Sequence, residues 1–226
     1  MPTELNRETL TVAMITRNEE KAVGKVIEDI RRVVPLAEIL VVDSSSDATA
    51  EIAERQGARV IKQFPPRGYG PAMDTALRSG GGQVVVTLDC DDTYPTEMIV
   101  KLARLVLDDG YDIVDGSRLQ HKPAAMPWLN YFANVGFALM ASVLFWHRLT
   151  DLHSGMRAYR KAMIDELRYE ANGAALPVEL LLRPLKMGKR LSVVFIDYRE
   201  RVGQSTMQPL PSAWWTLKRI LRVRFS

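Results

Sequence analysis

Short apolar runs, rich in β-branched residues, recur through the first half of the chain, and each is typical of a buried strand. They occupy residues 10–15, 38–42, 58–61, 83–88 and 112–114. Apolar residues recur with helical spacing over residues 19–33, between the first and second runs, and over residues 49–56, between the second and third. Gly57 marks the end of the second helix. Because alternating strands and helices form parallel sheets, the pattern predicts an α/β fold with a mostly parallel central sheet flanked by helices.

The second half contains a long segment without charge. No Asp, Glu, Lys or Arg occurs from Pro123 to Trp146, which is long enough to raise the question of a membrane span. Asn130 and Asn134 interrupt this segment and would lie on one face of a helix. We therefore expect a helix at about residues 128–147 that is buried or lies at a membrane interface, in preference to one that crosses the bilayer.

We expect one domain over residues 1–211, followed by a basic amphipathic tail over residues 212–226. On a helix, the apolar residues of the tail gather toward one side and the cations toward the other. The apolar set is Trp214, Leu217, Ile220, Leu221 and Phe225, and the basic set is Lys218, Arg219 and Arg222. Such a helix suits anionic lipid headgroups, and the alternative is a terminal helix packed on the domain with its basic face in solvent.

Composition narrows the class of protein. With 226 residues, of which 47% are hydrophobic, the chain can bury one sizeable core. Cys90 is the sole cysteine, which excludes an intrachain disulfide and fits a reducing cytosol, and the polar residues from Met1 to Thr9 do not form a signal peptide. The net charge of +3 includes four tail cations, so the remainder carries −1 and a general nucleic-acid-binding surface is not expected.

Three carboxylates follow the run at residues 83–88, at the point where its strand should end. They belong to Asp89, Asp91 and Asp92, with Thr93 beside them. Such crowded carboxylates repel one another unless a divalent cation offsets their charge. We therefore predict a Mg²⁺ or Mn²⁺ site at Asp89, Asp91 and Thr93, with a solvated acidic turn as the alternative. Cys90 is a poor ligand for such a hard ion, and we assign it to packing.

Polar and small residues also follow other predicted strands, where open α/β sheets bind their ligands. Backbone N–H groups at a helix start can receive phosphate, an acid after a strand can bind a base or ribose hydroxyl, and glycine lets a diphosphate approach the backbone. The residues that we assign to nucleotide binding on this basis are Ile15, Arg17, Glu19, Asp43, Arg67 and Gly68.

Three arginines in the second half are candidates for phosphate binding, namely Arg118, Arg157 and Arg201. The planar guanidinium matches the geometry of phosphate oxygens, and the alternative for each arginine is a surface ion pair. A hydroxyl acceptor would also need a general base, for which the candidates are Asp92, Glu179 and His153. His153 is better suited to supporting the loop that carries Arg157.

These features, in this order, resemble the family 2 glycosyltransferases of the GT-A fold, most closely the dolichol-phosphate or polyprenol-phosphate mannosyl- and glucosyltransferases. The resemblance runs from about Thr11 to Ser205. Asp89-Cys90-Asp91 is similar to the family's DxD motif, Gly116-Ser117-Arg118 to its GSR segment, Asp151 to Arg157 to its D-x-x-S-G-x-R segment, Val178-Glu179 to its acidic helix, and Arg201 to Ser205 to its R-x-G-x-S element.

The resemblance implies an inverting, metal-dependent transfer of a hexose, mannose or glucose, from a nucleotide-diphosphate sugar to polyprenyl phosphate. The protein would work peripherally at the cytoplasmic face of the membrane. Asp91 would take part in catalysis with the metal and Asp89, while the arginines at 118, 157 and 201 would hold the acceptor phosphate. Glu179 and Ser205 would join the substrate-binding set. A phosphate acceptor is already anionic near neutral pH and needs no strong base.

Two alternatives use the same residues differently. One keeps the donor chemistry and transfers the sugar to a soluble acceptor, such as a phosphorylated small molecule or a saccharide. The other is a non-catalytic peripheral membrane protein whose acidic cluster is structural. Ile15 and Arg17 stand where the family frequently has a proline and an aromatic residue, and the loop at Asp43 is one residue shorter than usual. The sequence therefore leaves open GDP against UDP, and mannose against glucose.

Overall fold

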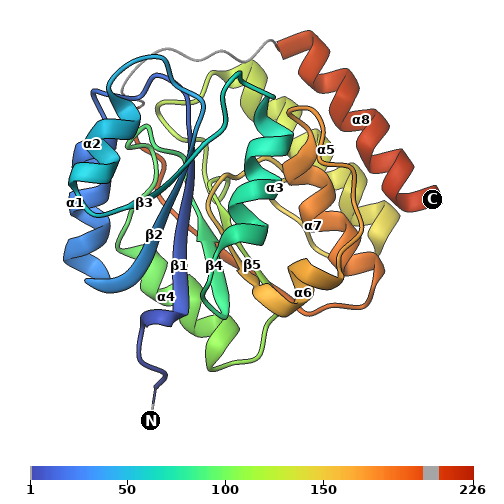
Figure 1. Cartoon of the computed structure of the whole chain (residues 1–226). Coiled ribbons are helices and arrows are strands. Elements are labelled where there is room, and N and C mark those ends of the chain that lie inside the picture. The colour runs from blue at the N-terminus through green and yellow to red at the C-terminus, as the bar shows by residue number, and fades with distance from the viewer. Residues whose placement is uncertain (1, 201–208) are drawn as a thin grey trace.

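A seven-stranded sheet forms the centre of the molecule, which a computed structural model describes over residues 2–200 and 209–226. The strands are β1 (Asn6–Thr16), β2 (Leu36–Asp43), β3 (Arg59–Lys62), β4 (Val84–Thr87), β5 (Ile113–Ser117), β6 (Arg157–Arg160) and β7 (Leu191–Phe195). Their order across the sheet is β3-β2-β1-β4-β6-β5-β7, and β6 runs antiparallel to both of its neighbours (Figure 1). The predicted mostly parallel sheet is confirmed.

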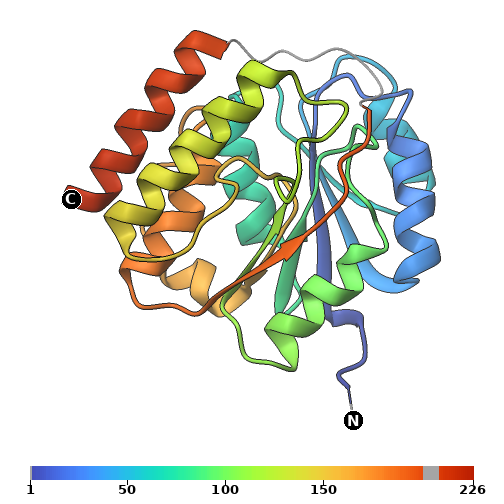
Figure 2. The same ribbon diagram turned by 180° about the vertical axis from the view of Figure 1, so that it is seen from behind.

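Helices of the described residues cover both faces of this sheet (Figures 1 and 2). One layer contains α1 (Val23–Val33), α2 (Thr49–Arg55) and α4 (Met98–Leu107). The other contains α3 (Tyr69–Ser79), α5 (Trp128–Phe145), α6 (Lys161–Glu166), α7 (Leu176–Lys186) and α8 (Pro209–Phe225). The central strands β2 and β4 and the second half of β1 are buried on both sides, which explains why their sequences are continuous apolar runs.

The strand directions gather several loops at one edge of the sheet. The parallel strands β1, β2, β4 and β5 all end at this edge. Because β6 is antiparallel, its first residue, Arg157, lies at the same edge, where it pairs with Thr87 of β4 and Asp115 of β5. The loops after the parallel strands and the loop before β6 therefore meet there.

The first helix begins later than its periodicity predicts. The amphipathic pattern starts at Glu19, whereas α1 begins at Val23. Asn18 has a positive φ of 59°, and the N–H groups of Ala22 and Val23 both donate to the carbonyl oxygen of Glu19 at 2.9 Å. Residues 19–22 thus form a turn, which leaves Glu19 in the loop at the edge of the sheet.

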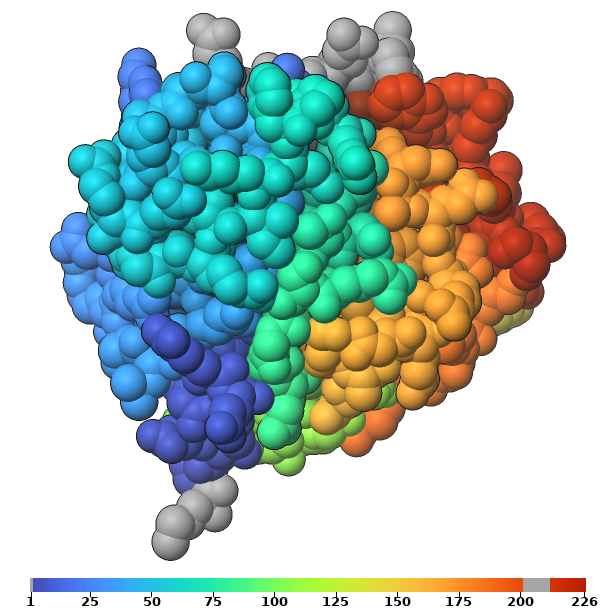
Figure 3. Space-filling model, viewed as in Figure 1, coloured from blue at the N-terminus to red at the C-terminus, as the bar shows by residue number. Residues whose placement is uncertain are grey.

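Helices α5 and α8 lie side by side on the outside of their layer (Figure 2). Helix α8 also packs along α7 at the edge of the molecule (Figure 3). Its buried side chains are Thr216, Arg219, Ile220 and Val223. Two residues of the tail do not lie on the face expected from the sequence. Ile220 packs inward with the other buried side chains, and Arg219 does not lie in solvent. The alternative of a packed terminal helix describes α8.

The outer side of α5 stays apolar and uncovered by described residues. Its span Trp128–Phe145 is long and apolar enough to cross a membrane by length and composition. Ala138 and Ala141 are buried against the rest of the molecule, whereas Leu139 and Val143 are 65% and 63% exposed. One side of the helix is therefore occupied by protein contacts.

Candidate active site

The carboxylate of Asp43 is fixed at the end of β2. Asp43 is buried, and its Oδ1 accepts hydrogen bonds from the hydroxyls of Thr16 and Ser45, both at 2.6 Å. The backbone N–H of Ser45 donates to Oδ2 at 3.1 Å. The carboxylate thus has a defined orientation at the edge of the sheet.

The loops after β1 and β2 are tied to each other. The backbone N–H of Asn18 donates to Ser45 Oγ at 2.7 Å, and Asn18 Oδ1 accepts from the backbone N–H of Ser46 at 2.9 Å. Ile15 is partly buried and Arg17 is exposed beside these contacts. Ile15, Arg17 and Asp43 are predicted to bind the nucleotide, and the structure brings their segments together.

The acidic segment follows β4 as predicted. Asp91 is 3% exposed, and its Oδ1 accepts from Thr93 Oγ1 at 2.6 Å. Asp89 packs against Gly155 so closely that a Cβ at residue 155 would lie 2.8 Å from both carboxylate oxygens. The N–H of Gly155 donates to the hydroxyl of Tyr94 at 2.8 Å. Gly155 therefore leaves room for the Asp89 carboxylate and for little else.

Cys90 lies between Asp89 and Asp91 in the acidic segment. The thiol is buried in the core, which confirms the packing role. Burial raises the pKa of Cys90 well above its usual range, and the negative charges of Glu19, Asp91, Asp89 and Asp43 raise it further. Residues from three separate loops thus form one electronegative cluster. The burial of the thiol and its raised pKa agree with a packing role for Cys90.

Asp92 does not follow the other two carboxylates of the segment. It has a positive φ of 62°, and its carboxylate pairs with Lys25 of α1 at 2.7 Å. Asp92 is therefore held by an ion pair. The expectation of three crowded carboxylates was wrong for Asp92, and Asp89 and Asp91 remain as candidates.

These two carboxylates and Thr93 fit a hard divalent cation. Among the described residues no three Asp, Glu, His or Cys side chains form a metal site by themselves. Mg²⁺ and Mn²⁺ sites in phosphate-transferring enzymes commonly use one or two carboxylates and take the remaining ligands from phosphate oxygens and water. The oxygen-only donor set and the close seat that Gly155 gives Asp89 are compatible with such a site.

The start of α3 carries two more of the residues predicted to bind the nucleotide, Arg67 and Gly68. Gly68 has a φ of 96° and immediately precedes the helix, and Arg67 next to it is exposed. Burial raises the pKa of the Tyr69 hydroxyl well above its usual range, and the charge of Asp89 adds to this effect. Tyr69 lies between Gly68 and Gly70, and no role was predicted for it from the sequence.

Arg118 is held at the end of β5 by Asp151. Arg118 Nε and Nη2 donate to the two carboxylate oxygens at 2.7 and 3.0 Å, and its backbone N–H donates to Oδ2 at 3.2 Å. The guanidinium lies 5.1 Å from the ring centre of Tyr198. Burial opposes ionisation of Asp151, but the charge of Arg118 prevails and lowers the pKa of Asp151 to about 2. Both members of this pair are therefore charged near neutral pH.

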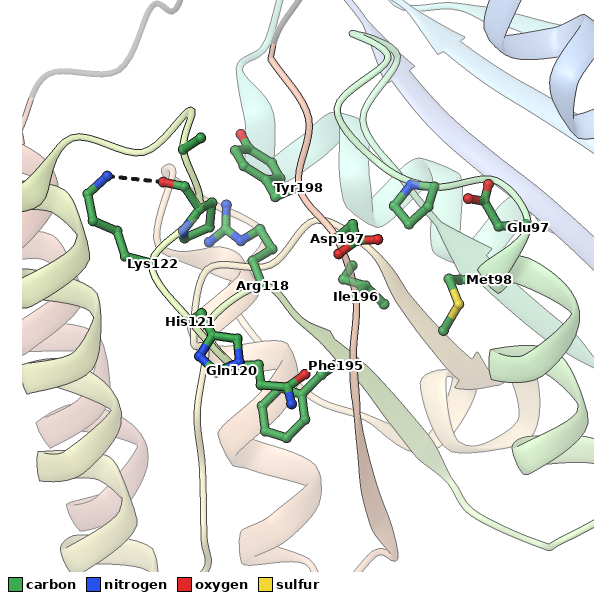
Figure 4. Close-up of a pocket in the computed structure, with 13 residues that line it drawn as sticks. Glu97, Met98, Arg118, Gln120, His121, Lys122, Phe195, Ile196, Asp197 and Tyr198 are labelled. Atoms are coloured by element: carbon green, nitrogen blue, oxygen red, sulfur yellow. Dashed lines mark hydrogen bonds between the residues drawn. The ribbon is translucent and has the colours of Figure 1, made fainter.

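Arg118 also lines a pocket of about 360 Å³ between the segments after β5 and β7 (Figure 4). The charged and ionisable side chains of its lining are Glu97, Arg118, His121, Lys122, Asp197 and Tyr198. In Figure 4, Arg118 and Tyr198 lie next to each other, and Lys122 and Glu97 lie on opposite sides of the pocket. The opening could admit a phosphate group to Arg118.

Arg157 has a different environment. It is fully buried, with Nε donating to Asp115 Oδ1 at 2.6 Å and Nη2 to the carbonyl oxygen of Asp151 at 3.3 Å. Nη1 donates to the carbonyl oxygen of Pro177. All three nitrogens contact protein oxygens, so the geometry favours support of the Asp151 loop over the expected contact with an acceptor phosphate.

Two candidate bases are also engaged by protein groups. Glu179 is 1% exposed and accepts from Arg183 Nε at 2.7 Å and from Arg219 of α8. His153 Nε2 lies 2.8 Å from the hydroxyl of Thr216, and burial lowers the pKa of His153 to about 4. Glu179 thus faces α8, and His153 supports the loop between Asp151 and β6. Arg201 and Ser205 lie outside the described residues.

Comparison with solved structures defines the fold. The chain matches glucosyl-3-phosphoglycerate synthase from Mycobacterium tuberculosis, in complex with Mn²⁺, uridine-diphosphate and phosphoglyceric acid, with a TM-score of 0.76 and 21% identity over 96% of this chain and 79% of that chain. It matches mannosyl-3-phosphoglycerate synthase from Rubrobacter xylanophilus with a TM-score of 0.69 and 20% identity over 96% and 72% of the two chains. The architecture is that of the GT-A glycosyltransferases.

Sequence comparison identifies the family. The model of Glycosyl transferase family 2 matches residues 11–168. A dolichyl-phosphate hexose transferase from Haloferax volcanii is 42% identical over 98% of this chain and 96% of its own length, and an undecaprenyl-phosphate mannosyltransferase from Micrococcus luteus is 30% identical over 85% and 84%. The chain belongs to glycosyl transferase family 2, as its motifs suggested, and is a glycosyltransferase.

Proposed function

We propose that the enzyme transfers a hexose, mannose or glucose, from a nucleotide-diphosphate sugar to polyprenyl phosphate, with inversion at the anomeric carbon. One observation carries this proposal. The segment that precedes β6 contacts the acidic cluster through Gly155 and holds Arg118 through Asp151, four residues earlier. A donor diphosphate at Asp89 and an acceptor phosphate at Arg118 would therefore be positioned by the same short loop.

The donor would bind across the loops after β1, β2 and β4. Asp43 and the segment from Ile15 to Glu19 are placed to contact the nucleoside. Asp89, Asp91 and Thr93 would hold Mg²⁺ or Mn²⁺, and Arg67 and Gly68 would lie along the diphosphate. A bound cation would offset the charge that grows on the leaving nucleotide diphosphate.

The contacts that the candidate bases make with other protein groups support a phosphate acceptor. Asp92 is paired with Lys25, Glu179 is paired with two arginines, and His153 is partly buried and has a lowered pKa. A hydroxyl acceptor would require a general base, whereas a phosphate monoester has a second pKa of about 6 and carries its own anionic oxygen. Two nitrogens of Arg118 are held by Asp151, so the pocket side of its guanidinium is presented to that phosphate.

The outer surface of α5 and α8 supports a lipid-linked acceptor. We call it the α5–α8 face and define it by its exposed apolar residues, which are Trp128, Leu129, Phe132, Val135, Leu139, Val143, Trp146, Trp214, Trp215, Leu221 and Phe225. Lys122 lies 4.8 Å from the ring centre of Trp128, and Lys218 lies 5.0 Å from that of Trp214. Aromatic residues next to cations are typical of proteins that bind the membrane interface. We propose that this face docks peripherally on the cytoplasmic side of the membrane.

Transfer assays test the reaction. The wild type and the Arg118→Ala variant are incubated with GDP-mannose or UDP-glucose, Mn²⁺, and either polyprenyl phosphate in vesicles or 3-phosphoglycerate. We expect the wild type to label the lipid and Arg118→Ala to lose transfer while it still binds the nucleotide. Arg104→Ala, at an exposed position on α4, is the matched control and should stay active. Labelling of 3-phosphoglycerate alone would establish the soluble-acceptor alternative.

Vesicle flotation tests the membrane face separately. The wild type should float with vesicles that contain anionic lipid, because apolar burial and charge act together there. Replacing Phe132 by Asp removes an exposed aromatic side chain and should move the protein to the soluble fraction. Equal flotation of the two proteins would refute the assignment of this face.

A further inference from the structure

Helix α8 carries a buried cation, Arg219, that the function proposed above does not use. We propose that Arg219 is a positioning residue for the donor site: it holds residues 170–172 against the start of α3, where the donor diphosphate would lie. This inference rests on the donor site of the proposed function and gives a role to a residue outside that site.

The guanidinium of Arg219 is enclosed by acceptors. Its side chain is 9% exposed and forms an ion pair with Glu179 of α7. Nη2 donates to the carbonyl oxygen of Asn172 at 2.8 Å and to Asn172 Oδ1 at 2.5 Å. Nη1 donates to the carbonyl oxygen of Glu170 at 3.2 Å. One side chain from α8 therefore fixes two backbone carbonyl groups of the 170–172 segment.

This segment is in direct backbone contact with the first turn of α3. A Cβ at Gly70 would lie only 2.7 Å from the backbone nitrogen of Asn172. Because no flexible side chain separates the two backbones, a shift of the segment would be passed on to α3. Gly70 lies two residues after Gly68, which the proposed function assigns to the donor diphosphate. The contacts thus connect α8 to the first turn of α3, beside Arg67 and Gly68.

The forked shape of the guanidinium is essential to this arrangement. A lysine at position 219 would keep a positive charge beside Glu179, but its single ammonium cannot reproduce the separate bonds to the carbonyl groups of Glu170 and Asn172. Arg222, one turn further along α8, pairs with the Glu170 carboxylate from an exposed position, with 53% of its side chain accessible. Arg222 therefore offers a matched control on the same helix and the same segment.

The test is calorimetric titration of UDP and of GDP, each with Mn²⁺, into the full chain, with thermal unfolding of the same samples. Arg219→Ala should weaken binding of the preferred nucleotide by about tenfold, equivalent to about 1.4 kcal/mol, at temperatures where the variant remains folded. Arg219→Lys should fall between Arg219→Ala and the wild type. Arg222→Ala should stay within about twofold of the wild type, because exposed ion pairs contribute little.

Unchanged nucleotide affinity in Arg219→Ala, with only a lower unfolding temperature, would overturn the proposal. If that variant does not fold, Asn172→Ala decides, because it removes one acceptor at an exposed position. Asn172→Ala should weaken nucleotide binding several-fold, and wild-type affinity in this variant would also overturn the proposal. A wild type that binds neither nucleotide would instead refute the donor site itself, and this inference with it.

Discussion

Substitution of Asp151 by Asn tests the buried ion pair that fixes Arg118. The two side chains are 9% and 0% exposed, and two hydrogen bonds of 2.7 and 3.0 Å join them. Removing one charge from a buried pair leaves the other uncompensated, which typically costs about 3–5 kcal/mol. Asparagine keeps the shape and one acceptor oxygen, so we expect a loss near the lower end, about 3 kcal/mol of unfolding free energy.

The pH dependence of this loss follows from the pKa of Asp151, which folding lowers from 3.8 to about 2. A carboxyl with a lowered pKa stabilises the fold above its unfolded pKa, and the contribution is lost as pH falls through the folded pKa. The difference in unfolding free energy between the wild type and Asp151→Asn should therefore have its full size above about pH 4. It should shrink by about 2 kcal/mol as pH falls toward 2.

Urea unfolding at a series of pH values measures this difference, and steady-state kinetics follow the KM for the acceptor. We expect a higher acceptor KM in Asp151→Asn, because Arg118 loses its fixed orientation. Asp165→Asn, which breaks the exposed pair with Lys161, is the control and should cost less than about 1 kcal/mol. Equal stability of Asp151→Asn and wild type at pH 7, with an unchanged acceptor KM, would refute the reasoning.

Three further predictions concern the same loop. Burial lowers the pKa of His153 from 6.5 to about 4, so the unfolded chain binds a proton that the folded chain excludes, and stability should fall by about 3 kcal/mol as pH drops from 6.5 to 4. Urea unfolding of His153→Gln at the same pH values should not show this fall in stability. Thr216→Val leaves His153 Nε2 without its partner and should cost about 1–3 kcal/mol by the same method. Gly155→Ala would place a Cβ 2.8 Å from both oxygens of Asp89, so calorimetry should show Mn²⁺-dependent nucleotide binding weakened by about tenfold or more; unaltered binding would contradict the close seat of Asp89.

Local patterns were sufficient to predict that the acidic segment follows a buried strand at the edge of the sheet. The run before Asp89 is a buried strand, and polar residues that directly follow such a strand reach the edge of the sheet wherever the strand lies. The same argument placed Asp43 and the loop at Arg17. Cys90 was assigned to packing from its chemistry alone, and it is buried.

Contacts between distant segments could not be predicted in this way. The antiparallel strand β6 was not foreseen, because pairing with β4 and β5 depends on residues far apart in the chain. For the same reason Arg157 was expected to face a ligand, whereas its partner Asp115 lies 42 residues away. The hydrophobic pattern of the tail also predicted the wrong face for Arg219. Its inward orientation depends on hydrogen-bond acceptors from Glu170, Asn172 and Glu179.

The most direct test of the account is the dependence of nucleotide-diphosphate binding on a divalent cation and on Asp91. Calorimetric titration of UDP or GDP into the wild type should show binding with Mn²⁺ and little without it. Asp91→Asn should weaken Mn²⁺-dependent binding by about tenfold or more, whereas Asp92→Asn, whose carboxylate is paired with Lys25, should bind as the wild type does. Binding of equal strength with and without Mn²⁺, unaffected by Asp91→Asn, would contradict the proposed metal-assisted transfer.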